Sequence, residues 1–129
     1  MAHFRSFEEL EVYKEATLFC DAIWDMISNA SLQKDYKLKE QINGSSGSIM
    51  DNIAEGFGRG GNKEFIMFLG FSRSSCSESK SQLLRAYNRQ HISEETYLEL
   101  NKKAQNLIDQ LSKFIDYHKN SKRRGSKFD

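Results

Sequence analysis

Residues 36–62 read YKLKEQINGSSGSIMDNIAEGFGRGGN, and six of the chain's eight glycines lie between Gly44 and Gly61. Apolar and small residues recur here at the three- and four-residue steps of one helix face, which predicts a helix over residues 36–57. The residues of this face are Leu38, Ile42, Ser45, Ile49, Asn52 and Gly56.

The middle of this helix, Gly44 to Ser48, allows an alternative. It reads locally as a loop, because each interior glycine costs about 1 kcal/mol relative to alanine. The apolar phase continues across it, which favours an unbroken helix in which Gly44 and Gly47 let another helix approach closely. We expect the glycines from Gly56 to Gly61 to end the helix, since glycine adopts the left-handed conformation at low cost.

Three more segments have helical spacing: residues 7–29, 63–90 and 94–119. Their expected N-terminal caps are a capping box of Ser6 with Glu9, then Asn62, then Ser93. The expected inward face of the first is Leu10, Tyr13, Thr17, Cys20, Trp24 and Ile27, widened by Phe7, Phe19 and Ile23.

The chain of 129 residues contains no proline, and no segment alternates with the period of a strand. These features predict an all-α fold. Because the connections between helices are short, we expect an antiparallel up-down four-helix bundle over residues 1–120. Residues 121–129 have no apolar phase and are expected to form a basic flexible tail.

Composition excludes several classes. Hydrophobic residues make up 38% and charged residues 29%, unlike a membrane-embedded or disordered chain. No apolar leader or run of ~18 residues is present, so we expect no membrane partner and a cytoplasmic location. Cys20 and Cys76 lack the spacing of a zinc site or disulfide framework and are expected to be free thiols.

Motifs for catalysis and metal binding are missing. A di-iron bundle needs Glu-x-x-His pairs, but no glutamate lies three residues before His91 or His118. The Gly44–Ser48 segment lacks the lysine of a phosphate loop, and Gly56–Gly60 follows a helix instead of a strand. We therefore expect no enzyme activity, no metal and no cofactor.

Basic residues are the candidate nucleic-acid ligands. The net charge is only +1, but residues 63–92 carry five basic and two acidic groups. Such cations can neutralise phosphates, and a symmetric ring would multiply them; the alternative is a solvated helix face and a solubilising tail. The candidates are Arg73, Lys80, Arg85, Arg89, Lys119, Lys122, Arg123, Arg124 and Lys127.

An ordered series of motifs runs along the chain. It includes Phe7-Glu8-Glu9-Leu10-Glu11-Val12, Asn52-Ile53-Ala54-Glu55-Gly56-Phe57-Gly58-Arg59 and Lys63-Glu64-Phe65. From about Phe4 to His118, the sequence resembles the four-helix-bundle family of proteins encoded in intervening sequences of 23S rRNA genes. The accessory variability protein of diversity-generating retroelements is a relative of that family.

The resemblance implies an antiparallel bundle that assembles into a ring, commonly a pentamer, without enzyme activity. It also implies a basic surface, since the retroelement relative binds its reverse transcriptase and nucleic acid in that way. This chain departs from the family at Asn43 and Gly44, where many members carry arginines, and at Ser74-Ser75 in place of Gly-Ser.

The five motif residues Asn52, Glu55, Gly56, Gly58 and Arg59 are expected to be structural, fixing a helix end or a subunit contact. A carboxylate near a helix C-terminus is disfavoured by the helix dipole. The cation that offsets this at Glu55 is Arg59 or one from a neighbouring subunit. A buried amide at Asn52 needs hydrogen-bond partners.

Two hypotheses for function follow. The first is a non-enzymatic, self-assembling bundle (a homo-oligomer) that binds RNA or DNA through its basic surface. The alternative is a protein-binding accessory or scaffold module that makes no nucleic-acid contact.

Overall fold

The computed structural model describes residues 4–121, and within them it contains helices and no strand. A 3-10 turn, η1 (Phe7–Glu9), precedes α1 (Glu11–Ile27). A short helix, α2 (Ala30–Gln33), leads into α3 (Tyr36–Gly58), which is followed by α4 (Asn62–Asn88) and α5 (Glu94–Asn120). The all-α four-helix bundle is therefore confirmed.

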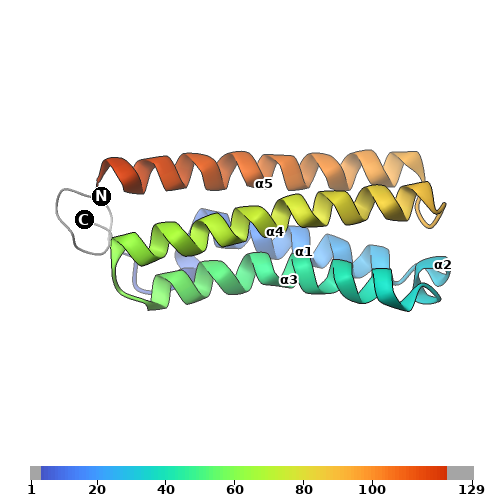
Figure 1. Ribbon diagram of the computed structural model, residues 1–129, viewed down its shortest axis with the longest axis horizontal. Helices are drawn as coiled ribbons and strands as arrows, with labels where there is room; N and C mark the ends of the chain where they lie inside the picture. Colours follow the sequence, from blue (N-terminus) through green and yellow to red (C-terminus); the bar gives the residue numbers. More distant parts are fainter. Residues whose placement is uncertain (1–3, 122–129) are drawn as a thin grey trace.

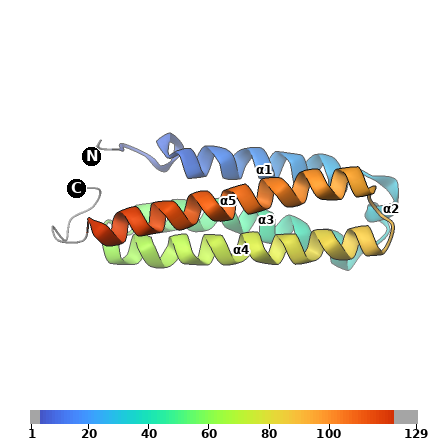
Figure 2. The ribbon, with the colours of Figure 1, turned by 90° about the horizontal axis from the view of Figure 1, so that it is seen from above.

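The four long helices lie side by side with alternating direction (Figures 1 and 2). Around the bundle, α3 lies next to α1 and α4, and α5 lies next to α4 and α1. The start of α1 and the end of α5 share one end of the bundle, and α2 and the α4–α5 turn share the other (Figures 1 and 2). No helix in residues 4–121 is long and apolar enough to cross a membrane.

The helix α3 continues through Gly44 and Gly47 without a break, as the apolar phase predicts. These two glycines do not bring a second helix close, so that expectation is wrong. They point outward, and a Cβ atom added to either would meet nothing within 4 Å. The chain turns at Gly60, whose φ of +88° lies in the left-handed region.

Serines provide the close approach between α3 and α4. Ser45 Oγ lies 2.8 Å from Ser79 Oγ, and Ser72 Oγ donates to the carbonyl of Ile49 at 2.8 Å. Because these hydroxyls find partners inside the bundle, the polar middle of the core is hydrogen-bonded.

The inward face of α1 agrees with the prediction at Phe19, Ile23 and Ile27 and differs from it elsewhere. The buried residues of α1 are Val12, Ala16, Phe19, Ile23, Met26 and Ile27. Trp24, which was expected to face inward, is 62% exposed. The helix has two apolar stripes, and spacing alone does not reveal which of them faces the core.

Two of the three predicted caps are wrong. Glu9 accepts a hydrogen bond from the backbone N–H of Arg5, not of Ser6, and Ser6 forms no side-chain cap. The expected helix over residues 7–29 is divided into η1 and α1, and the short helix α2 follows it. Asn62 is the first residue of α4 and donates to the carbonyl of His118 at 2.9 Å. Ser93 caps α5 by accepting from the Thr96 N–H at 3.1 Å, as expected.

Candidate nucleic-acid interface

Arg73 and Lys80 lie two turns apart on the side of α4 that faces α5, and both are half-buried. Arg73 donates to the hydroxyl of Ser112 at 3.1 Å, and Lys80 donates to the side-chain carbonyl of Gln105. Both partners are neutral. These two partners therefore hold the cations in place and do not compensate their positive charge.

Arg85 lies on the opposite side of α4, where it donates to Gln41 of α3 at 2.9 Å. Arg89, at the C-terminal end of α4, forms an ion pair with Asp35 at 2.8 Å. The four predicted cations of this segment therefore do not form one patch, and the charge of Arg89 is compensated.

The other candidate cations lie near the end of α5. Lys119 is exposed in the last turn of the helix, where a cation interacts favourably with the dipole. The remaining tail candidates lie outside the described residues: Lys122, Arg123, Arg124 and Lys127.

The motif around Glu55 lies at the C-terminal end of α3. Arg59 forms an ion pair with Glu55 at 2.9 Å and lies over the ring of Phe68, 5.0 Å from its centroid. Asn52 is half-buried and donates to the carbonyl and the hydroxyl of Ser48 at 2.8 and 2.9 Å. Asn52 thus has its partner on α3, and Glu55 has its partner at Arg59, the residue that directly follows α3.

Gly56 provides a second tertiary contact of the motif, also with Phe68. A Cβ atom at this position would lie 2.5 Å from the Cβ atom of Phe68 on α4. Gly58, the last residue of α3, has open space around it. Of these two glycines, only Gly56 is required by packing within the described part of the chain.

A polar cluster at the opposite end of the bundle was missed by the sequence reasoning. His91 Nδ1 lies 2.6 Å from Ser31 Oγ, and His91 Nε2 lies 2.9 Å from the Asp35 oxygen that pairs with Arg89. The hydrogen bond from Arg89, and to a smaller extent the one from His91, lowers the pKa of Asp35. The two partners of each of these hydrogen bonds are 54 to 60 residues apart in the sequence, so no local sequence pattern predicts the cluster.

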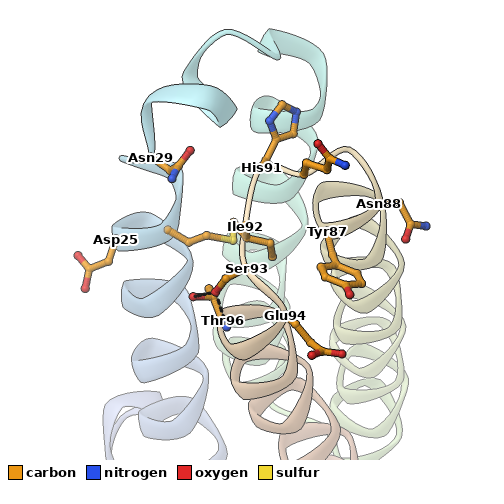
Figure 3. A pocket seen from close by; sticks show the side chains of 11 residues that line it. Asp25, Asn29, Tyr87, Asn88, His91, Ile92, Ser93, Glu94 and Thr96 are labelled. Carbon is orange, nitrogen blue, oxygen red and sulfur yellow. Dashed lines mark hydrogen bonds between the residues drawn. The ribbon is translucent and has the colours of Figure 1, made fainter.

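A pocket of about 880 Å³ lies beside this cluster, between the ends of α1, α4 and α5. Figure 3 shows His91 and Ile92 on the connection between α4 and α5, with Tyr87 on α4 and Asn29 beyond the end of α1. The cluster joins α2 and the start of α3 to the α4–α5 turn, which is a structural arrangement.

The two thiols are poor nucleophiles. Burial raises the pKa of Cys76 to about 12, and burial also raises the pKa of Cys20. Since the thiolate is the reactive form, neither cysteine is activated at neutral pH. The described residues include no group of three or more metal-ligating side chains of the His, Cys, Asp and Glu types.

The architecture defines the class of protein: an antiparallel four-helix bundle with a glycine motif at the α3–α4 turn. The family model of the 23S rRNA-intervening sequence protein matches residues 8–113. The chain therefore belongs to this family. The comparison with curated proteins found no match.

A solved structure with a similar fold is a protein of unknown function from the S23 ribosomal protein family of Bacteroides thetaiotaomicron VPI-5482. The TM-score is 0.73 and the sequence identity 23%, over 81% of this chain and 97% of the other. At this identity, the likeness supports the fold alone.

Proposed function

We propose that this protein is a non-enzymatic bundle that self-assembles and binds RNA or DNA through surface cations. The observation that carries the proposal is the pairing of Arg73, Lys80 and Arg85 with neutral acceptors. Such partners orient a cation and leave its charge available to a phosphate. They also limit the side-chain entropy that phosphate binding costs.

Self-assembly is supported by the outer sides of α3 and α4. Gly44 and Gly47 are interior helical glycines with open space around them, and each costs about 1 kcal/mol that no contact among residues 4–121 requires. On α4, Met67 and Phe71 are about half exposed. A helix of a second copy could cover these surfaces, and we propose a closed ring, with five copies as the number to test first.

A salt titration tests nucleic-acid binding. Binding of labelled RNA and duplex DNA fragments is measured between 50 and 300 mM salt for the protein and for Arg73→Gln/Lys80→Gln. Loss of two phosphate contacts should reduce the slope of log affinity against log salt by about 1.4 for single strands and about 1.8 for duplex DNA. The matched control is Arg89→Gln, because Asp35 already compensates that charge. A slope near zero for the unmodified protein would exclude phosphate contact.

A protein-binding accessory remains the second candidate. The exposed side chains of Leu18 and Trp24 on α1, 61% and 62% exposed, are its specific observation. Failure to bind either nucleic acid at low salt would favour this candidate over the first.

Sedimentation analysis tests self-assembly separately. The variants Met67→Lys and Phe71→Lys should dissociate the oligomer, whereas Leu98→Lys, at an equally exposed position of α5, should not. A protein that sediments as a monomer at every concentration would contradict self-assembly.

A further inference from the structure

A groove of about 600 Å³ lies between the N-terminal half of α1 and the C-terminal half of α5. Its lining residues belong to the start of α1, the segment just before it and the end of α5, which share one end of the bundle (Figures 1 and 2). Its apolar lining includes Val12, Phe114 and Tyr117, and the Tyr117 side chain is 42% exposed. The surface thus offers an aromatic and aliphatic floor that no described residue fills.

The rim of the groove is acidic. Among the described residues that line it are Glu9, Glu11 and Glu15, with Lys113 as the one cation. Within residues 4–121, the ion pair of Glu11 is a long one, 3.6 Å from Lys14, and both side chains are more than half exposed. Such a pair compensates charge weakly. The groove therefore favours an occupant that combines positive charge with an aromatic side chain.

We infer that residues 122–129 of the same chain, KRRGSKFD, dock in this groove. They directly follow Ser121 and lie outside the described residues. Their sequence offers the matching chemistry, with Arg123 and Arg124 for the carboxylates and Phe128 for the apolar floor. Gly125 lies between these two groups and allows the chain to reverse direction.

Residues 122–129 are long enough to reach the groove from Ser121. The stretch of α5 from Gln110 to Ser121 rises about 16 Å at 1.5 Å per residue. Eight extended residues span up to about 27 Å, so residues 122–129 can turn back along α5 and still place Phe128 over the groove. Because a short tether gives an effective concentration in the millimolar range, even weak intrinsic affinity suffices for docking.

If the protein binds nucleic acid as proposed, docking of the tail affects that binding. The tail cations are candidate phosphate ligands, and the same cations neutralise the groove carboxylates when the tail is docked. The docked tail and nucleic acid therefore compete. Removal of the groove carboxylates should release the tail and increase nucleic-acid affinity.

Cross-linking of the full chain with a carbodiimide tests the docking itself. This reagent joins a lysine amine to a nearby carboxylate, so we expect links from Lys122 or Lys127 to Glu9, Glu11 or Glu15. A mixture of unlabelled and 15N-labelled chains identifies the source of the tail. Links within one isotope support docking in the same chain, whereas mixed-isotope links would overturn it in favour of a second copy. The absence of any such link would overturn it altogether.

Ring NMR signals of Tyr117 provide the second readout. The variants Phe128→Ser and Glu11→Gln/Glu15→Gln should shift these signals in the same direction, because both release the tail. The matched controls Ser126→Ala and Glu95→Gln/Glu99→Gln should leave them unchanged. Shifts that are equal in variants and controls would contradict docking.

The RNA titration is then repeated with Glu11→Gln/Glu15→Gln. A several-fold increase in affinity relative to Glu95→Gln/Glu99→Gln supports the competition, and an unchanged affinity overturns it. If neither protein binds RNA, the proposed function fails, whereas the Tyr117 signals and the cross-links still decide whether the tail docks.

Discussion

Gly56 of α3 lies so close to Phe68 of α4 that a methyl group on Gly56 would be 2.5 Å from the Phe68 Cβ atom. Atoms that are attached so directly to the backbone cannot move aside without a shift of the helix. Phe68 also carries the guanidinium of Arg59 over its ring. The contact thus fixes the spacing of α3 and α4 next to the turn that joins them.

We expect Gly56→Ala to lower the free energy of unfolding by about 1–3 kcal/mol, because the added methyl overpacks the contact with Phe68. The measurement is urea denaturation at a concentration where the oligomeric state is unchanged. Gly44→Ala is the control, since open space surrounds Gly44. It should stabilise an isolated subunit by about 1 kcal/mol through helix propensity. A Gly56→Ala protein as stable as Gly44→Ala would contradict the packing argument.

The turn between α4 and α5 contains a residue in an unfavourable conformation. Gln90 has φ +64°, and the hydrogen bonds from Gln90 N to Tyr87 O and from His91 N to Ala86 O form a Schellman motif. Glycine usually occupies this position. We expect Gln90→Gly to raise the free energy of unfolding by about 1 kcal/mol. Asn88→Gly, inside the last turn of α4, should lower it by a similar amount, and equal effects of the two variants would contradict the prediction.

The four long helices could be predicted because each carries an apolar phase over 17 to 27 residues. A long apolar period predicts a helix more strongly than a short loop-like stretch predicts a break, and α3 indeed continues through Gly44 and Gly47. The buried face of α1 was harder to predict. Its outward apolar stripe ends in Trp24, and tryptophan is usually buried. In the structure, Trp24 is 62% exposed.

The candidate site was less accessible to sequence reasoning. The positions of Arg73, Lys80 and Arg89 on α4 could be predicted, but their partners could not, because they lie 25 to 54 residues away. A neutral partner at Arg73 and an acidic partner at Arg89 change what each cation can bind. Only the tertiary structure distinguishes the two cases.

The ion pair between Glu55 and Arg59 is exposed, with about half of each side chain accessible. We expect Glu55→Ala to reduce stability by only about 0.3–0.5 kcal/mol in an isolated subunit. A larger loss, together with a changed oligomeric state in sedimentation, would indicate that Glu55 also contacts a neighbouring copy. An unchanged assembly with an unchanged melting temperature would exclude a structural role for Glu55.

Acid sensitivity should arise from His118, whose side chain is buried against Phe65 and Phe114 and whose Nδ1 lies 3.1 Å from Asn62 Oδ1. Burial lowers the pKa of His118 to about 4, from an ordinary value of 6.5. Between these values the unfolded chain takes up a proton that the folded chain does not, so stability falls as the pH decreases from about 6.5 to about 4. Above pH 6.5 this contribution is constant.

The expected loss over that interval is on the order of 3 kcal/mol, because each pKa unit corresponds to about 1.4 kcal/mol. Urea denaturation at pH 7, 5 and 4 measures it. His118→Gln should remove most of this pH dependence, whereas Lys119→Gln, at the adjacent exposed position, should retain it. If His118→Gln loses as much stability as the unmodified protein between pH 7 and pH 4, the acid sensitivity comes from other groups and the burial of a neutral His118 does not control it.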